Sequence, residues 1–251
     1  MKLICMGDSI MQYNTWKTYP QTGWVQMLDR FLLPGIQILN FARNGRSTKS
    51  FINEGRFEKV LINTEPKDIV LIQFAHNDEK KQDESRYTDC CENGEFRKNL
   101  EFFVKKIKEK KALPILLTPV VRRNFISQTE IENTHGDYPL AIIETAKKLN
   151  VPFVDITSLS KKYFEDIGDE KSKSFFMNFE KGIYSNYQDG KNDNSHLRPD
   201  GAFCISLLAA ESFCSMYLEW PEYEEFSKSI VLNESINNDV EIDDEYLMWR
   251  S

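Results

Sequence analysis

Short apolar runs alternate with longer segments of helical periodicity along this chain, and this alternation is the strongest constraint on its fold. The expected strands are residues 2–6, 36–41, 69–74, 115–117 and 152–154. The expected helices are residues 24–31, 57–62, 95–110, 140–149 and 202–216. Strands that are apolar on both faces, separated by helices, are typical of a parallel sheet covered on both sides. The pattern predicts a three-layer α/β/α domain with about five parallel strands.

One domain accounts for most of the chain. The 251 residues are an ordinary length for a single α/β domain, which we assign to residues 1–220. Residues 221–251 are acidic and weakly periodic, so we expect an appendage that packs on the domain or is partly disordered. Residues 79–94 are polar and predict a loop at the edge of the sheet where the strands end.

Charge and cysteine content limit the partners and the compartment. The net charge of −7 argues against a nucleic-acid partner, because phosphate binding needs clustered cations. No segment has the length and apolarity of a membrane span, and the first strand begins at once, so we expect neither a membrane partner nor a secretory leader. Five cysteines without metal-ligand spacing predict free thiols, no metal site and a cytoplasmic location. The oligomeric state stays open.

Polar and glycine-containing segments follow the expected strands. They are residues 7–9, 40–47, 74–78 and 118–123, with residues 193–196 just before the last expected helix. Because ligands of open α/β sheets bind where the carboxyl ends of the strands converge, we expect these segments to form one site.

Residues of these segments suit nucleophilic ester hydrolysis. A serine hydroxyl needs a positioned base, and His196 can take the proton of Ser9 and return it to the leaving group. Asp193, three residues earlier, can fold back within one short turn to orient the imidazole. The backbone N–H groups of Ser9 and Gly45 and the side-chain amide of Asn77 can form an oxyanion hole.

Each of these motifs is weak by itself. Gly-Asp-Ser after a strand is also typical of a helix N-cap, and Asn77 alone suits a turn. Ser9, Gly45, Asn77 and the Asp193-x-x-His196 pair, in this order, together predict an esterase site.

These four blocks resemble the SGNH (GDSL-like) hydrolases, whose name comes from residues that match Ser9, Gly45, Asn77 and His196. The resemblance covers the chain from residue 1 to residue 216. It implies a flavodoxin-like α/β/α fold and a Ser-His-Asp triad completed by Asp193, with no metal and no organic cofactor.

Within these hydrolases, the chain is most similar to the rhamnogalacturonan acetylesterase family. The similarity rests on residues 44–51 with 55–56, 73–78, 118–125 and 135–139. Three positions depart from the family pattern, since Ala75 replaces a glycine, Ser195 a threonine and Ile10 a leucine. None of these departures removes a catalytic group, although Ala75 could alter a close backbone approach.

The resemblance implies removal of O-acetyl groups from pectic oligosaccharides, with an acetylated oligosaccharide as the partner. An esterase acting on other acetylated sugars, such as xylan fragments, or on small acyl esters is the nearest alternative, because loops set the substrate on a shared scaffold. A carbohydrate-binding protein without catalysis is a further alternative.

Other polar residues of these segments have open roles. We expect Asp8 to accept hydrogen bonds from loop N–H groups and His76 to be structural or to shape the substrate site. His135 fits a sugar contact and a solvated side chain equally well. Arg122 or Arg123 could bind a uronate carboxylate, and a structural salt bridge to an acidic loop is the alternative.

Overall fold

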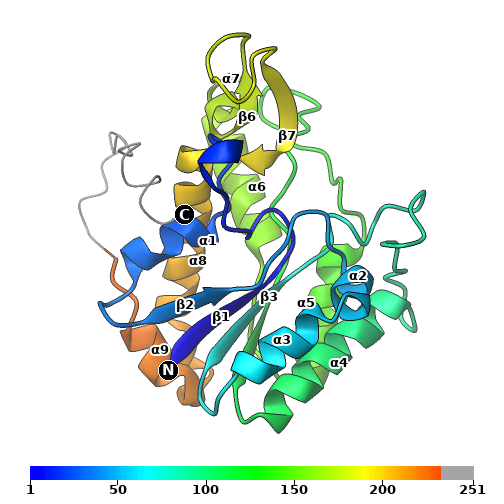
Figure 1. Ribbon diagram of the computed structural model, residues 1–251, viewed down its shortest axis with the longest axis vertical. Coiled ribbons are helices and arrows are strands. Elements are labelled where there is room, and N and C mark those ends of the chain that lie inside the picture. The colour runs from blue at the N-terminus through cyan, green and yellow to red at the C-terminus, as the bar shows by residue number, and fades with distance from the viewer. Residues whose placement is uncertain (233–251) are drawn as a thin grey trace.

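The computed structural model describes residues 1–232 and has a parallel sheet at its centre (Figure 1). Its five strands run in the order β2-β1-β3-β4-β5. They are β1 Lys2–Gly7, β2 Gln37–Asn40, β3 Ile69–Gln73, β4 Leu113–Leu117 and β5 Phe153–Val154. All four neighbouring pairs are parallel. Each strand coincides with an expected one, so the apolar runs predicted the sheet correctly.

Side chains of each central strand alternate between two hydrophobic cores. In β1, Leu3 and Cys5 belong to one core, whereas Ile4 and Met6 belong to the other. The first core is covered by α1 Val25–Leu28, α6 Ile156–Ile167 and α8 Pro199–Cys214. The second is covered by α2 Thr48–Asn53, α3 Arg56–Asn63, α4 Glu95–Glu109 and α5 Tyr138–Leu149. The three-layer α/β/α prediction is therefore confirmed.

Several elements were not expected from the sequence. They are α2, α6, α7 Asp169–Ser172 and a two-stranded antiparallel sheet of β6 Phe176–Phe179 and β7 Lys191–Leu197. Short 3-10 helices occur at Trp16–Thr18, Asp29–Phe31, Lys173–Phe175, Met216–Leu218 and Pro221–Tyr223. The sequence of β7, Lys-Asn-Asp-Asn-Ser-His-Leu, lacks the β-branched and aromatic residues that mark a strand, which explains why it was missed.

The long helix α8 corrects one expectation about the membrane. Residues 199–218 form a helical segment of 20 residues that contains an 18-residue stretch with a mean hydropathy of 1.5, so by length and composition this segment could cross a bilayer. The expectation that no segment has the length and apolarity of a membrane span is therefore wrong. Half of the segment is buried inside the fold, and α8 packs against α1 and α6. Its apolar composition follows from its place in the core.

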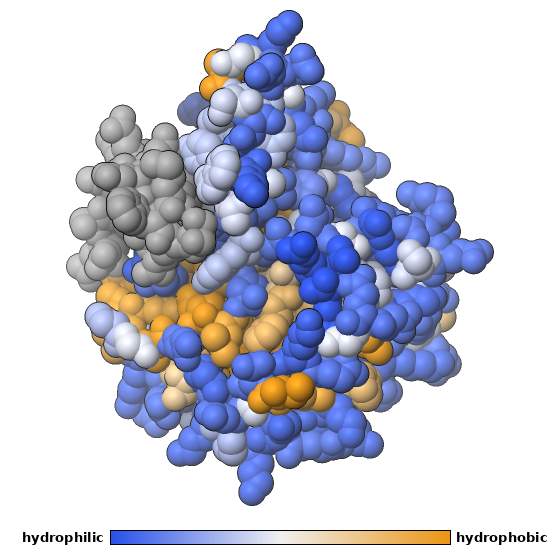
Figure 2. All heavy atoms as spheres, in the orientation of Figure 1, coloured by the Kyte–Doolittle hydropathy of each residue, from blue (hydrophilic) through white to orange (hydrophobic). Residues whose placement is uncertain are grey.

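The first part of the expected acidic appendage packs on the domain. Tyr223 donates a hydrogen bond from its hydroxyl to the carbonyl of Pro114 (2.7 Å), and Phe226 of α9 Glu224–Lys228 contacts Phe213 of α8. Residues 233–251, the remainder of this appendage, lie outside the described residues. On the face in Figure 2, hydrophilic residues dominate and apolar residues gather over β1 and the edge strand β2.

Candidate active site

The strand order places the predicted site at the switch point of the sheet. β1 lies between β2 and β3, so the connections that leave β1 and β3 run to opposite sides. Ser9 follows β1 and Asn77 follows β3. In this topology, ligands bind outside the carboxyl ends of these two strands, because the diverging connections open a crevice there.

A chain of hydrogen bonds joins Ser9, His196 and Asp193. His196 Nε2 lies 3.0 Å from Ser9 Oγ, and its Nδ1 lies 2.8 Å from Asp193 Oδ2. The other carboxylate oxygen of Asp193 accepts hydrogen bonds from the backbone N–H groups of Ser195 (2.9 Å) and His196 (3.0 Å). These distances suit transfer of the serine proton to the imidazole.

An irregularity in β7 makes this arrangement possible. Met177 pairs with Asp193 and the adjacent Phe176 pairs with Leu197, so residues 194–196 bulge out of the ladder. The bulge lets the Asp193 side chain fold back to His196. The sequence predicted this contact correctly but placed it in a turn ahead of the helix, not within a strand.

The surroundings of Asp193 keep its carboxylate ionised. Burial disfavours the charge, but hydrogen bonds from the His196 side chain and from two backbone N–H groups outweigh it and lower the pKa of Asp193 well below its usual value. An ionised Asp193 can stabilise a positive charge that develops on His196.

Arg123 and Asn178 anchor the bulge. The backbone N–H of Arg123 donates to the carbonyl of Asn194 (2.8 Å), and its Nη1 donates to Asn194 Oδ1 (3.0 Å). Asn178 Nδ2 donates to the same oxygen (2.9 Å). Arg123 is 6% exposed and pairs with Asp169. Its guanidinium thus has a structural salt bridge, which was the alternative to uronate binding.

The predicted oxyanion donors follow three adjacent strands of the sheet, β1, β2 and β3. Gly45 has φ of +78°, a conformation that favours glycine, and lies in the loop after β2. Asn77 Nδ2 donates one hydrogen to the carbonyl of Arg46 (3.1 Å), which leaves its second hydrogen for a ligand. Within residues 1–232, the backbone N–H groups of Ser9 and Gly45 donate no hydrogen bond.

Lys80 orients the Asn77 amide and was not predicted from the sequence. Its Nζ donates to Asn77 Oδ1 (2.9 Å), which fixes the amide with Nδ2 directed toward the loop of Gly45. Lys80 lies in the expected polar loop after β3, where nothing in the local pattern distinguishes it from Lys81. Only the backward fold of this loop shows which lysine meets Asn77.

Ala75 and Asp78 flank Asn77 in unusual states. Ala75, where the family pattern has glycine, adopts φ of +148°, a region that L-residues rarely occupy. Burial raises the pKa of Asp78 to about 7, although hydrogen bonds from Thr48 and Thr88 act to lower it. The replacement of glycine by Ala75 therefore has a conformational cost, because glycine adopts this φ without strain.

Asp8, His76, Glu79, His135 and Arg122 form a polar cluster in which Asp8, His76 and His135 are buried. Asp8 Oδ1 accepts from the Ile10 N–H (3.0 Å), as expected, and its Oδ2 lies 3.3 Å from His76 Nδ1. Burial lowers the pKa of His76, against the attraction of Asp8. His76 is 6% exposed, so its ring is packed inside the protein next to Asn77.

His135 and Arg122 both bind Glu79. His135 Nδ1 lies 3.0 Å from Glu79 Oε2 and its Nε2 lies 2.9 Å from the Val120 carbonyl, so the ring is neither a sugar contact nor solvated. Both sequence-based alternatives for His135 are wrong, because the loop turns this ring inward. Arg122 pairs with Glu79, as the salt-bridge alternative predicted. Burial opposes ionisation of Glu79, but hydrogen bonding to His135 and the nearby positive charges lower its pKa to about 2.

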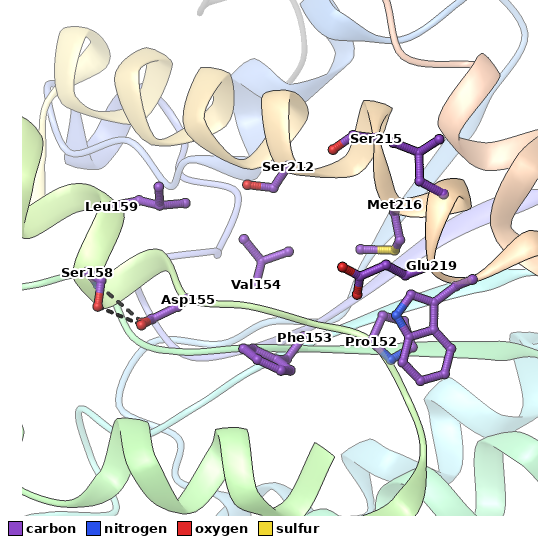
Figure 3. Close-up of a pocket in the computed structure, with 12 residues that line it drawn as sticks. Pro152, Phe153, Val154, Asp155, Ser158, Leu159, Ser212, Ser215, Met216 and Glu219 are labelled. Atoms are coloured by element: carbon purple, nitrogen blue, oxygen red, sulfur yellow. Dashed lines mark hydrogen bonds between the residues drawn. The ribbon is translucent and has the colours of Figure 1, made fainter. Parts of the chain in front are cut away.

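A separate cavity of about 430 Å³ lies between β5, the start of α6 and the end of α8 (Figure 3). Two of its polar residues are already engaged, because Asp155 accepts hydrogen bonds from Ser158 as the N-cap of α6. Val154, Leu159 and Met216 supply apolar walls. Neither Ser9 nor His196 lines this cavity, so it is not part of the predicted site.

Comparison with known proteins gives the same family as the motifs. Residues 5–179 match the GDSL-like Lipase/Acylhydrolase family. The chain belongs to this family. Membership confirms the resemblance to GDSL-like hydrolases and the prediction of a serine ester hydrolase. The matched range contains Ser9, Gly45 and Asn77 and ends before β7.

Relatives in Bacillus subtilis (strain 168) carry acetylesterase names. The chain is 35% identical to rhamnogalacturonan acetylesterase RhgT over 84% of this chain and 88% of that protein. It is 33% identical to the probable rhamnogalacturonan acetylesterase YesY over 86% of this chain and 94% of that protein.

Solved structures share the fold at lower identity. The Bacillus subtilis protein YxiM superposes with a TM-score of 0.73 and 24% identity, over 86% of this chain and 56% of that one. Axe2, an acetylxylan esterase from Geobacillus stearothermophilus, has a TM-score of 0.59 and 17% identity over 84% of this chain and 92% of that one. At these identities the likeness concerns the fold alone.

Proposed function

We propose that this enzyme removes O-acetyl groups from carbohydrates, specifically from pectic rhamnogalacturonan oligosaccharides, through an acetyl-enzyme formed on Ser9. The observation that carries the chemistry is the 3.0 Å approach of His196 Nε2 to Ser9 Oγ at the switch point of the sheet. The acetyl group and the pectic sugar are supported by the names of the relatives that match this chain over most of its length.

In the first half-reaction, Ser9 Oγ attacks the acetyl carbonyl carbon while His196 Nε2 takes the hydroxyl proton. The negative charge moves to the carbonyl oxygen, where the N–H groups of Ser9 and Gly45 and the amide of Asn77 bind it. The bond to the sugar oxygen then breaks, and His196 delivers its proton to that oxygen. The products are a free sugar hydroxyl and acetyl-Ser9.

In the second half-reaction, water replaces the sugar. His196 takes a proton from water as the oxygen attacks the acetyl carbonyl, and the same donors bind the second oxyanion. The bond to Ser9 Oγ breaks, His196 returns the proton to the serine, and acetic acid leaves. Asp193 holds the imidazole orientation throughout and stays ionised, which its lowered pKa favours.

The test is acetate release from acetylated rhamnogalacturonan oligosaccharides, acetylated xylan fragments and a small acyl ester. We expect the pectic substrate to react fastest and Ser9→Ala to lose roughly a million-fold in kcat. Ser127→Ala, which changes an exposed serine, is the matched control and should keep the full rate. Fastest release from xylan would reject the pectic substrate, and sugar binding without any acetate release would favour a binding protein.

A further inference from the structure

Basic residues gather around the proposed oxyanion hole of a protein whose net charge is −7. Arg43 is exposed in the loop that carries Gly45, and Lys80 Nζ lies 2.9 Å from Asn77 Oδ1. Arg86 reaches the same place from the loop after β3. A Cβ atom on Gly45 would lie 3.6 Å from Arg86 Nη1, so this guanidinium rests against Gly45. The most hydrophilic colouring of this face in Figure 2 lies beside α2, near the loop that follows β2.

The fold holds Arg86 in this position. The Arg86 N–H donates to the Asp83 carbonyl (3.0 Å) in a tight turn. Two residues later, Thr88 Oγ1 donates to Asp78 Oδ1 (2.7 Å), and the Tyr138 hydroxyl donates to the Thr88 carbonyl (2.7 Å). Since Asp78 adjoins Asn77, the loop is fixed to the segment that supplies an oxyanion donor.

The guanidinium keeps donors for a ligand. Its Nε pairs with Asp83 Oδ2 (3.0 Å), and the side chain is 37% exposed. The two Nη atoms carry four N–H groups that can bind a carboxylate in bidentate fashion. In contrast, Arg122 is 19% exposed and Arg123 is 6% exposed, and both guanidiniums are taken up by Glu79 and Asp169. The arginine pair that the sequence suggested for uronate binding is therefore already occupied.

We propose that Arg86 is a specificity-determining residue that binds the carboxylate of an acetylated uronic acid. In such a sugar, the carboxylate and the acetylated hydroxyl belong to the same ring. When the acetyl carbonyl binds at Gly45 and Asn77, the carboxylate therefore lies no farther away than the width of one sugar ring. Arg86, which rests against Gly45, is within that range. Lys80, whose Nζ lies 2.9 Å from Asn77 Oδ1, adds a second positive charge at the site. The proposal rests on the proposed function, because it assumes that the acetyl carbonyl binds there.

Oligosaccharides that differ only in charge test this proposal. We would measure acetate release from acetylated rhamnogalacturonan oligosaccharides with free carboxylates and from the same compounds with methyl-esterified carboxylates. For the wild type, we expect KM to be roughly tenfold lower with free carboxylates, as for one charge-assisted hydrogen bond. Arg86→Gln should raise KM for the free carboxylates by roughly tenfold, with little change in kcat or in the rate on the esters. Lys148→Gln, which removes an exposed charge on α5, is the control and should change neither.

Other outcomes overturn the proposal. Equal losses of kcat on both substrates in Arg86→Gln would mean that the guanidinium only supports the Gly45 loop. An unchanged preference would mean that Arg86 does not bind the carboxylate.

Binding separates this proposal from the proposed function. The dissociation constants of both oligosaccharides would be measured with Ser9→Ala and with the double variant Ser9→Ala/Arg86→Gln. A preference for free carboxylates that disappears in the double variant supports Arg86 even if the wild type releases no acetate. Equal affinities of Ser9→Ala for the two oligosaccharides would reject it.

Discussion

Ser9 and His196 meet from two supports of different kinds. Ser9 follows β1, a strand that is hydrogen-bonded to a parallel neighbour on each side and lies between two hydrophobic cores. His196 lies on β7, which within residues 1–232 pairs with β6 alone, outside the main sheet. The residues of β7 are half-buried or exposed except for Leu197.

These supports are stabilised by different forces. Burial of apolar side chains is non-directional, so the sheet tolerates small shifts while its core stays filled. The bulge of β7 depends on directional hydrogen bonds from Arg123 and Asn178 to Asn194. A change in the sheet should therefore reduce the amount of folded protein, whereas a change beside the bulge should alter the geometry of the folded enzyme.

Among variants that keep the nucleophile, the largest effect is expected at the oxyanion donor that the sheet side supplies. Asn77→Ala removes one oxyanion donor, and we expect kcat to fall by roughly 100- to 1000-fold with the fold retained. Acetate release and thermal unfolding would measure the two quantities. Asn63→Ala, at an exposed position of α3, should leave both unchanged. A near-normal kcat would remove Asn77 from the mechanism.

A pair of variants tests the two supports against each other. Leu71→Ala opens a cavity in the fully buried β3, and we expect a loss of about 2–5 kcal/mol in unfolding free energy. Its kcat per folded molecule should stay within about twofold, because no polar contact of the site changes. Asn194→Ala removes the acceptor of Arg123 and Asn178, which should lower kcat by roughly tenfold and stability by only about 1–2 kcal/mol.

Urea unfolding and kinetics on the same preparations would measure both quantities. The comparison fails if Leu71→Ala loses as much kcat as Asn194→Ala. It also fails if Asn194→Ala keeps the wild-type kcat, since the hydrogen bonds of the bulge would then not position His196.

The difference between apolar burial in the sheet and directional hydrogen bonds at β7 also determines which features the sequence could predict. The five strands were predictable because apolar runs report directly on burial between two helical layers. Ser9, Gly45, Asn77, Asp193 and His196 were predictable as motif positions, and the structure brings Ser9, His196 and Asp193 into hydrogen-bond contact. β7 was missed because its polar sequence carries no burial signal, and its pairing depends on Asn178, fifteen residues before Asp193.

The contacts of the polar loops were the least predictable. Lys80 and Arg86 lie in a loop whose sequence indicates only a polar surface, and their roles follow from where that loop folds back. His135 lies in a segment of polar residues, yet it is buried because Glu79 and the Val120 carbonyl bind both ring nitrogens. Such partners are distant in sequence, so no local pattern encodes them.

Two carboxyl groups, half-buried Asp193 and buried Asp78, extend the comparison to charge. Asp193, beside His196, is held ionised, whereas burial raises the pKa of Asp78 to about 7 from a usual value of 3.8. The groups that face Asp78 are the donors Thr48 and Thr88 and the carboxylate of Asp8. Between pH 3.8 and about pH 7, Asp78 keeps its proton in the folded protein, whereas the unfolded chain has released it. Its contribution to stability is therefore present at low pH and is lost as the pH rises through about 7.

Asp78→Asn should remove this dependence, because an amide stays neutral. Between pH 3.8 and about pH 7, the unfolding free energy of the wild type should fall relative to that of the variant as the pH rises. The decrease should be at most about 1.4 kcal/mol per pH unit. Urea unfolding of both proteins at several pH values measures the difference. The lowered pKa of His76 makes the unfolding free energy rise with pH below the usual histidine value of 6.5. This effect is common to both proteins, so it cancels in the comparison. Parallel pH profiles would mean that Asp78 is ionised like Asp193.

The smallest effect concerns backbone strain on the sheet side of the site. Ala75 adopts φ of +148°, which glycine reaches freely and which costs other residues about 1–3 kcal/mol. Ala75→Gly relieves this strain, which stabilises the fold. The loss of a buried methyl group and the higher entropy of the unfolded chain are destabilising. We expect a net gain of up to about 1 kcal/mol in unfolding free energy.

Ala146→Gly is the matched control, because Ala146 is also fully buried but lies in the regular helix α5. It loses the same methyl group without relief of strain, and we expect a loss of about 1 kcal/mol or more. Opposite signs at the two positions, measured by urea unfolding, would place stored strain beside Asn77. Equal losses would mean that the backbone at Ala75 is relaxed, and the sheet would then present its oxyanion donor without a conformational cost.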